Sequence, residues 1–318
     1  MGRVRLGPAR GPRRRAGWLG CGIGLVIYLA ASTTPAAAAT NPCGGAAAPP
    51  ATYDHVVVIM EENLSYKNAI GSTKAPYLNA LASECALATN FRNETHGSQP
   101  NYMAATSGFA TGVGAHSTNP TIFEQVSSWN ELEESMRAPC GATATHYKRG
   151  HDPAYWYTPI VAACKRFDLP MTASDLGATK VPTAAYTFMT PNTCHDHHWE
   201  KGCSGSSKTS VQSMDTWLSG TIQAIQQTAD YQAGRTLVFV TFDEGQAGTP
   251  GENCTDPANT DPSCHVATIA VAAGVQPVAD PTFYTHYSML RACEEALGIT
   301  TFLGNAATAP DMRPGMGF

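Results

Sequence analysis

The chain has 318 residues, of which 43% are hydrophobic and only 14% are charged. This apolar content is enough for a buried core, so the composition excludes a wholly disordered chain. The net charge of −5 is unevenly distributed, because six arginines and no acidic residue lie before residue 40. Without those six, 14 of the 20 Lys and Arg remain against 25 Asp and Glu, a net charge of −11. A chain this acidic is a poor non-specific binder of nucleic acid or anionic membranes, so the charge excludes these functions.

The N-terminal segment has the order of regions found in a secretory signal peptide. A basic stretch over residues 3–15 precedes an apolar run over residues 18–31, and small residues follow up to Ala39. This order predicts a signal peptide over residues 1–39 and a secreted, extracellular protein, with the export route left open. The alternative is an uncleaved anchor, but a membrane span needs about 20 apolar residues. No later segment is apolar for long enough, so we expect no stable membrane insertion.

Nine cysteines follow residue 39, and an exported protein would hold them as disulfides. They are Cys43, Cys85, Cys140, Cys164, Cys194, Cys203, Cys254, Cys264 and Cys293. An odd number allows at most four bridges and one free thiol, and the sequence leaves the pairing open. The pairs closest in sequence, 194 with 203 and 254 with 264, would each close a polar loop. A zinc site is the alternative, which the absence of a C-x-x-C motif disfavours.

The predicted elements, taken in chain order, indicate an α/β protein. Residues 40–52 are rich in Ala, Pro and Gly and predict a flexible linker, which one domain over residues 53–318 follows. Runs of β-branched residues predict buried strands, and apolar residues at helical spacing predict helices. The expected strands are His55–Met60, Ala185–Met189, Arg235–Phe242 and Val266–Ala273, and the expected helices are Pro76–Ala86, Pro100–Thr106, Ser210–Tyr231 and Tyr284–Leu297. Because strands alternate with helices, we expect a mostly parallel central sheet.

Acidic residues directly follow two of the expected strands. The first strand leads into Glu61, Glu62 and Asn63, and the Arg235–Phe242 strand leads into Asp243 and Glu244. Ligands of such sheets bind beyond the carboxyl ends of the strands, so these side chains suggest oxygen ligands for a divalent cation. The alternative is that the acids cap the next helix or face solvent.

Ser98 lies just before an expected helix that has Pro100 in its first turn. The free N–H groups and the dipole of a helix N-terminus attract anions, which suits a serine that attacks phosphorus. The local pattern by itself favours the alternative that Ser98 is a simple N-cap.

Histidines in predicted loops are the third chemical signal. They are His151, His195, His197, His198, His265 and His286, four of them in or next to the runs HDP and HDHH. Such positions suit phosphate binding, metal ligation or proton transfer to a leaving group. For any single histidine the alternative is a structural or surface role.

The ordered motifs are HVVVIMEENLSY from His55, SQPNY from Ser98, HDP from His151, PNTCHDHH from Pro191, VFVTFDEG from Val238 and THYSMLRACEEALGI from Thr285. Over about residues 53–299, this series resembles the bacterial phosphoesterase family that unites secreted acid phosphatases with non-zinc phospholipases C. The resemblance implies the three-layer αβα sandwich of alkaline phosphatase, with a mostly parallel central sheet.

The resemblance also implies roles for individual residues. It implies a divalent cation of open identity, held by Glu62, Asn63, Ser98, Asp243 and Glu244. It places Asn101, His151, Asp196 and His198 around the phosphate, with His265 and His286 matching less closely. Ser98 would attack phosphorus to form a phosphoserine that water then hydrolyses, while His198 or His151 protonates the leaving oxygen.

We therefore expect a secreted metal-dependent phosphatase that acts on small phosphate esters. The alternative within the family is a phospholipase C or phosphodiesterase that uses the same site on a phospholipid headgroup. A sulfatase-type hydrolase is disfavoured because SQPNY lacks the arginine of the C/S-x-P-x-R motif. A non-enzymatic, disulfide-stapled secreted binding protein is the third alternative, and its metal content would distinguish it.

Overall fold

The computed structural model describes residues 41–45, 48–171 and 183–318, so the expected signal peptide lies outside the described residues. Within them, nine strands form one sheet in the order β4-β3-β5-β1-β6-β7-β2-β8, with β9 beside β2. The strands are β1 (His55–Glu61), β2 (Ala86–Arg92), β3 (Trp129–Glu134), β4 (Asp168–Met171), β5 (Tyr186–Thr190), β6 (Thr236–Phe242), β7 (His265–Val271), β8 (Val278–Asp280) and β9 (Tyr284–Thr285). Neighbouring strands run parallel except at β7, which is antiparallel to both β6 and β2. The prediction of a mostly parallel sheet is confirmed.

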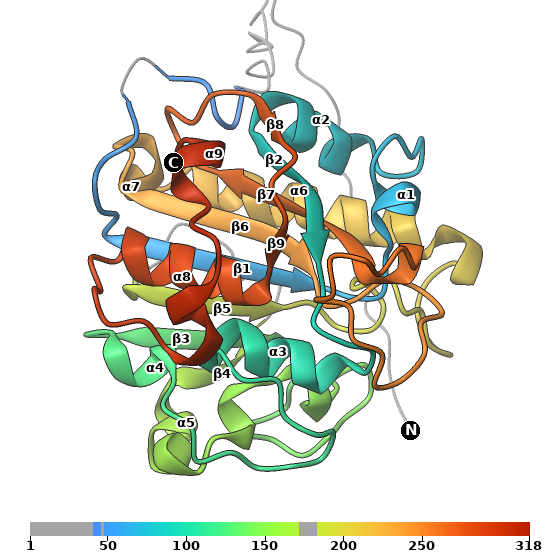
Figure 1. Cartoon of the computed structure of the whole chain (residues 1–318). Coiled ribbons are helices and arrows are strands. Elements are labelled where there is room, and N and C mark those ends of the chain that lie inside the picture. The colour runs from blue at the N-terminus through green and yellow to red at the C-terminus, as the bar shows by residue number, and fades with distance from the viewer. Residues whose placement is uncertain (1–40, 46–47, 172–182) are drawn as a thin grey trace, which may run out of the picture. The chain divides into compact units, whose positions relative to one another are not determined.

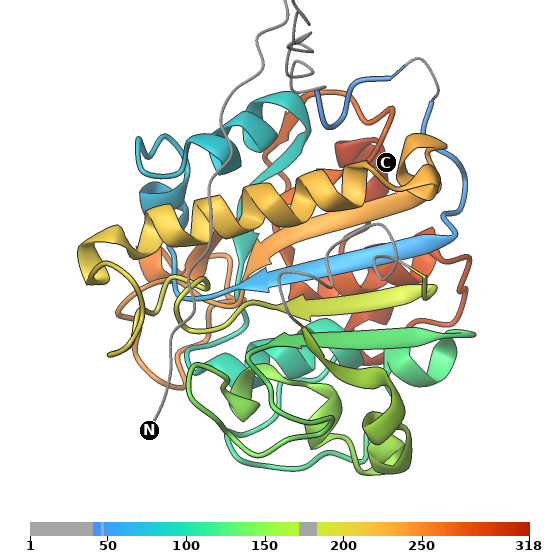
Figure 2. The same ribbon diagram turned by 180° about the vertical axis from the view of Figure 1, so that it is seen from behind.

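Helices cover both faces of the sheet, which gives the expected three layers. They are α1 (Tyr66–Ala69), α2 (Pro76–Glu84), α3 (Ser98–Ser107), α4 (Ile122–Gln125), α5 (Val161–Phe167), α6 (Ser210–Gln226), α7 (Ala229–Gln232), α8 (His286–Ala296) and α9 (Arg313–Met316). The helices α3 and α8 lie on the face turned to the viewer in Figure 1. The long helix α6 crosses the opposite face with α2 beside it, as Figure 2 shows. The chain therefore has an αβα sandwich architecture.

The four expected strands are present because their β-branched residues are buried on both faces. The side chains from Val56 to Met60 on β1, for example, have no exposed area. The remaining strands have weaker sequence signals. Buried glutamates interrupt the apolar pattern of β3, and β8 and β9 have only three and two residues. Their formation depends on pairing with strands distant in sequence.

The cysteines form four disulfides, Cys43–Cys85, Cys140–Cys164, Cys194–Cys203 and Cys254–Cys264, which include both pairs closest in sequence. In the described part of the chain, Cys293 is the one free cysteine, and it is buried. The flexible linker over residues 40–52 stays a prediction, and its described part makes two kinds of contact with the domain. The disulfide ties this segment to the core at Cys43, and Arg313 donates hydrogen bonds to the carbonyls of Pro50 and Ala51.

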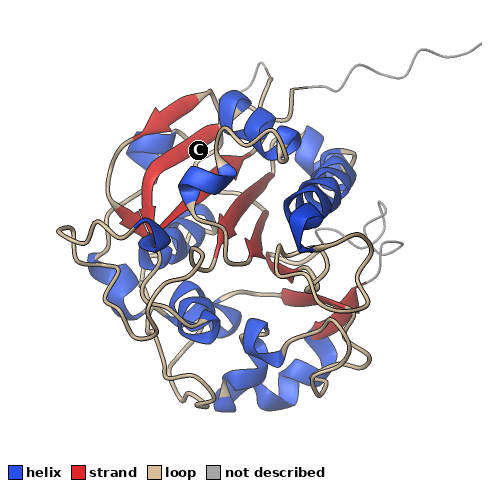
Figure 3. Cartoon of the chain, turned by 90° about the vertical axis from the view of Figure 1, so that its right-hand side faces the viewer, coloured by secondary structure: helices blue, strands red, loops and turns tan. Residues whose placement is uncertain are grey.

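The parallel strands β1, β5 and β6 end at the same edge of the sheet, on the right in Figure 1. Figure 3 views the molecule from this side, where long loops connect the strands to the helices. In such a sheet this edge is where ligands bind. Within the described residues, no helix combines the length and apolarity needed to cross a bilayer.

Candidate active site

The two acidic segments meet because β1 and β6 are adjacent and parallel, with Glu61 paired to Phe242. The next residues along both strands therefore leave the sheet side by side. The backbone N–H of Asn63 donates to Asp243 Oδ1 over 3.0 Å, and the Asn63 amide donates to Glu62 Oε2 over 2.6 Å. Asn63 has a left-handed backbone (φ +48°), which turns the chain sharply at this point. These hydrogen bonds fix the carboxylates of Glu62 and Asp243 next to each other.

Glu62 and Asp243 are fully buried carboxyl groups. No hydrogen bond from the described residues reaches Glu62 Oε1 or Asp243 Oδ2. Burial raises the pKa of both groups well above the usual range, and the charge of each neighbouring carboxylate adds to the effect. Among the described residues, no lysine or arginine forms an ion pair with either one. Two buried, unpartnered carboxylate oxygens fit a hard divalent cation.

Ser98 is the first residue of α3, and its side chain does not cap the helix. Gly97 occupies the N-cap position with φ +106°, a conformation that favours glycine. The Ser98 hydroxyl instead donates to Glu62 Oε2 over 3.1 Å. The alternative of a simple N-cap is therefore wrong. Ser98 combines contact with a buried carboxylate and a place at a helix N-terminus, where anions bind favourably.

Asn101 lies one turn into α3, and its amide is fully engaged by the loop before the helix. Its Oδ1 accepts the backbone N–H groups of Glu94 and Thr95 at 2.9 and 3.2 Å. Its Nδ2 donates to the carbonyls of Thr95 and Gly97 at 2.9 and 3.3 Å. The expectation that Asn101 touches the phosphoryl oxygens does not fit these bonds, because both amide N–H groups are already used. Its observed role is to shape the loop that carries Ser98.

His151, His198 and Asp196 form the wall beside Glu62. His151 Nε2 lies 3.2 Å from Glu62 Oε1, and His198 Nδ1 lies 3.6 Å from Glu62 Oε2. The two rings stack with centroids 5.5 Å apart, and Asp196 contacts both. Burial lowers the pKa of His151 well below its usual value. Burial also opposes the charged form of His198, but its bonds to Asp196 outweigh this effect and raise the pKa.

The remaining predicted histidines lie outside this cluster. His286 is fully buried behind β6, where its Nε2 lies 3.0 Å from the carbonyl oxygen of Phe242. Burial lowers its pKa to about 4. His265 stacks on Tyr66 and contacts the Thr89 carbonyl, and His195 pairs with Glu134. The expectation of a place beside the phosphate does not fit the contacts of His286, which supports the end of the strand before Asp243.

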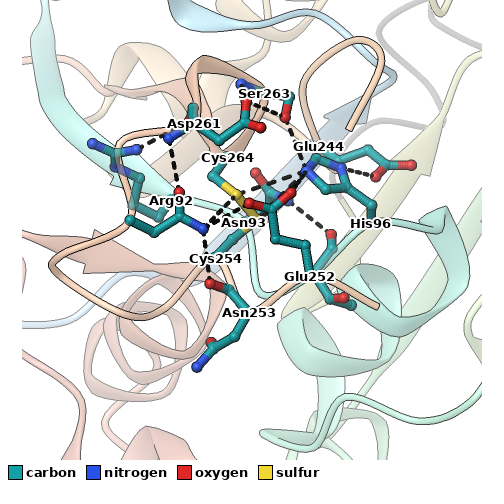
Figure 4. The surroundings of a disulfide bond; sticks show 12 residues. Arg92, Asn93, His96, Glu244, Glu252, Asn253, Cys254, Asp261, Ser263 and Cys264 are labelled. Carbon is teal, nitrogen blue, oxygen red and sulfur yellow. Dashed lines mark hydrogen bonds and ion pairs between the residues drawn. A yellow bond between two sulfur atoms is a disulfide. The ribbon is translucent and has the colours of Figure 1, made fainter. Parts of the chain in front are cut away.

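His96 is a site residue that the sequence reasoning missed. Its Nδ1 lies 2.6 Å from Glu244 Oε2, which also accepts the Gly97 N–H over 2.9 Å. Figure 4 shows the ring between Glu244 and the Cys254–Cys264 disulfide, with Ser263 Oγ 3.1 Å from Nε2. Glu244 thus connects the loop of Ser98 to the acidic end of β6. The partners lie 148 residues apart, so spacing along the chain could not indicate the pair.

The model of the Phosphoesterase family matches residues 72–300 of the chain. The chain belongs to the Phosphoesterase family. It is therefore a hydrolase that acts on phosphoric ester bonds, which confirms the family resemblance drawn from the motifs. The match covers Ser98, His151, His198 and Asp243 but begins after Glu62.

Curated relatives share about a quarter of their residues with this chain. A phosphatidylinositol-3-phosphatase of Mycobacterium tuberculosis is 25% identical over 272 residues, which cover 81% of each chain. An acid phosphatase of Aspergillus fumigatus is 25% identical over 75% of this chain, which spans about half (53%) of the fungal enzyme. A solved structure from Vibrio parahaemolyticus, described as a protein in the alkaline phosphatase superfamily, superposes with a TM-score of 0.59. The superposition covers 85% of this chain and 74% of the Vibrio chain at 14% sequence identity. This match shows the alkaline-phosphatase-like fold.

Proposed function

We propose that the protein is a secreted, metal-dependent phosphatase with Ser98 as its nucleophile. The observation that carries this proposal is the 3.1 Å contact between the Ser98 hydroxyl and Glu62, at a helix N-terminus and beside buried carboxylates. A phosphate ester placed there has a nucleophile, a helix dipole and oxygen ligands for a cation within one site. The relatives named as phosphatases support the same class of reaction.

Glu62, Asp243, Asn63 and Ser98 would hold the cation, since Asn63 and Ser98 both contact the carboxylates at the ends of β1 and β6. Bound there, a divalent cation would lower the pKa of the serine hydroxyl and offset negative charge on the phosphoryl oxygens. We assign Glu244 a supporting role at this site, because His96 and the Gly97 N–H both engage its Oε2.

The proposed reaction has two steps. The Ser98 oxygen attacks phosphorus as its proton leaves along the hydrogen bond to Glu62, and the bond from phosphorus to the ester oxygen breaks. His198, whose pKa is raised by Asp196, gives its proton to the departing alcohol. Water then attacks the phosphoserine and gives a proton back to His198. The bond from phosphorus to the Ser98 oxygen breaks, Ser98 takes its proton back from Glu62, and phosphate is released. His151 stacks against both His198 and Tyr102, which holds the wall in place.

Phosphomonoesters are the substrate class that we favour. The names of the mycobacterial and fungal relatives both describe release of phosphate from monoesters. The alternative is cleavage of diesters, as in a phospholipase C. Secretion is supported by the signal-peptide pattern and by the four disulfides, which persist in oxidising surroundings.

The test compares Ser98→Ala with Ser107→Ala in the chain that starts at residue 40. Ser107 lies at the other end of α3, where its hydroxyl donates to the Met103 carbonyl, so it is a matched control. With para-nitrophenyl phosphate, Ser98→Ala should lose roughly 10³-fold or more in kcat, while Ser107→Ala stays close to wild type. A kcat of Ser98→Ala within tenfold of wild type would refute the assignment of Ser98 as the nucleophile.

Substrate class is tested with the same proteins on bis-para-nitrophenyl phosphate and on phosphatidylinositol 3-phosphate vesicles. Release of inorganic phosphate from the monoesters, with little turnover of the diester, is the expected result. Preference for the diester would replace the phosphatase with a phosphodiesterase that uses the same serine.

A further inference from the structure

A second group of buried carboxylates lies around β3 and β4, and β3 is two strands along the sheet from β1, which leads into Glu62. Glu131 and Glu133 point the same way from β3, Asp152 follows the turn that carries His151, and Asp168 begins β4. All four are at most 1% exposed. One oxygen from each of Glu131, Glu133 and Asp152 lies within 4.8 Å of the other two. These three acidic groups therefore share one solvent-free region. Asp168 lies next to them as the register partner of Glu131 on the neighbouring strand, and its Oδ2 accepts the Cys140 N–H over 2.8 Å.

The protein supplies donors for only part of this oxygen set. The backbone N–H of Ala154 donates to Glu131 Oε2 over 2.8 Å, and the Tyr147 hydroxyl donates to Asp152 Oδ2 over 2.5 Å. Three further oxygens are buried and have no hydrogen-bond partner among residues 41–45, 48–171 and 183–318; these are Glu131 Oε1, Glu133 Oε1 and Asp168 Oδ1. A carboxylate oxygen buried without a donor is costly, so these unpartnered atoms point to a missing positive partner.

The two basic side chains just before His151 in the sequence make their hydrogen bonds and ion pair with other groups. Arg149 donates to the Gly141 carbonyl and lies over the ring of Tyr155, and Lys148 pairs with Glu200. Burial raises the pKa of Asp152 to about 6 and that of Asp168 to about 9, and it raises the pKa values of Glu131 and Glu133 well above their usual range. A cation in their midst would reverse this effect, because it favours the ionised form of every carboxyl group around it.

We propose that Glu131, Glu133, Asp152 and Asp168 bind a calcium ion. Calcium takes six to eight oxygen ligands and tolerates irregular geometry, as a cage of several carboxylates provides. Magnesium instead keeps several waters and uses one or two carboxylates, which a fully buried protein cage does not suit. Soft metals are disfavoured because the nearby sulfurs of Cys140 and Cys164 are joined in a disulfide.

The calcium ion would join three segments that are separate in sequence. These are β3, the start of β4 and the turn that leads from Tyr147 to Ala154. His151 is in this turn, and its ring reaches Glu62 on the far side. The site is thus a structural one that holds the active-site wall from behind, independent of the cation proposed beside Ser98.

The experiment measures bound calcium and thermal unfolding in the chain that starts at residue 40. Wild type is compared with the double variant Glu131→Gln and Glu133→Gln, which keeps the shape but removes two charges. Glu134→Gln is the matched control, because Glu134 is on the same strand but pairs with His195 at the surface. After equilibration in CaCl₂, calcium per chain should be lower by one in the double variant than in wild type and control.

The unfolding temperature gives the second reading. At a calcium concentration about a hundredfold above Kd, the rise in Tm relative to EGTA should be about 5 °C larger in wild type than in the double variant. Equal calcium content and equal shifts would overturn the proposal and mean that shared protons keep the carboxyl groups neutral.

Hydrogen exchange of the wild type decides the matter if the double variant does not fold. Calcium should slow exchange in peptides that cover β3 and residues 147–155, relative to EGTA. Slower exchange confined to peptides around Glu62 and Asp243, or none at all, would overturn the proposal.

Discussion

Replacement of His96 by alanine tests whether the Ser98 loop is held through Glu244. The change removes a 2.6 Å hydrogen bond to a carboxylate and leaves only the Gly97 N–H on that oxygen. A hydrogen bond to a charged group contributes about 1.5–3 kcal/mol, which corresponds to roughly 10- to 100-fold in an equilibrium or rate constant. We therefore expect kcat/KM to fall by about that factor, with a similar weakening of metal affinity.

The assay follows para-nitrophenyl phosphate hydrolysis while the divalent cation is titrated, for wild type, His96→Ala and His55→Ala. His55 is the matched control, because it starts β1 at the end away from the site and contacts the Ala184 carbonyl. Circular dichroism checks that each variant is folded. If folded His96→Ala keeps kcat/KM within twofold of wild type at every metal concentration, the coupling through Glu244 does not exist.

Three further predictions concern the cation, the pH dependence of stability and a disulfide. A chelator should abolish hydrolysis, and added cation should restore it; hydrolysis unaffected by the chelator would contradict the metal site. The Asp243→Asn variant should remain at least about 100-fold below wild type in kcat at any cation concentration. Burial raises the pKa of Glu94 from 4.5 to about 8, so the unfolded chain releases this proton at lower pH than the folded one. Between pH 4.5 and about 8, the contribution of Glu94 to the free energy of unfolding therefore falls by about 1.4 kcal/mol per pH unit. The stability of Glu94→Gln relative to wild type should accordingly increase as the pH rises from 5 to 7.5. Urea denaturation at both pH values measures this difference, and a constant difference would contradict the assignment. Replacement of Cys43 and Cys85 by serine removes a disulfide that closes a loop of 42 residues. It should lower the free energy of unfolding by about 4 kcal/mol in the same assay, and a decrease of less than about 1 kcal/mol would contradict this prediction.

The parts of the fold that sequence could predict are those with a local signal. The β-branched residues of β1 are hydrophobic enough to be recognised as a buried strand. The acidic residues directly after this strand can then be placed at the edge of the sheet. The parallel pairing of β1 with β6 then brings Glu62 to Asp243. Strand β3 lacks such a signal, because Glu131 and Glu133 occupy positions where an apolar residue is the usual choice.

Roles that depend on distant partners could not be predicted in the same way. The motif around Ser98 contains Asn101, but only the folded loop reveals that its amide is used up by the backbone of residues 94–97. His286 stands at the start of a helix in the sequence, and its contact with Phe242 follows from how α8 packs on the sheet. For both residues, the local sequence pattern indicated a position near the site but could not predict which atoms they contact.

The candidate site has a buried floor and an exposed rim. Buried elements hold the floor, since α3 is almost wholly buried and His286 supports the end of β6 from behind. The rim includes residues 109–116, a largely exposed loop in which Val113 lies against Gly97, next to Ser98. If the proposed site is correct, substitutions in this loop would change which alcohol fits beside the phosphate while the reacting groups stay in place. An arrangement of this kind lets one hydrolytic chemistry diversify over many substrates during evolution.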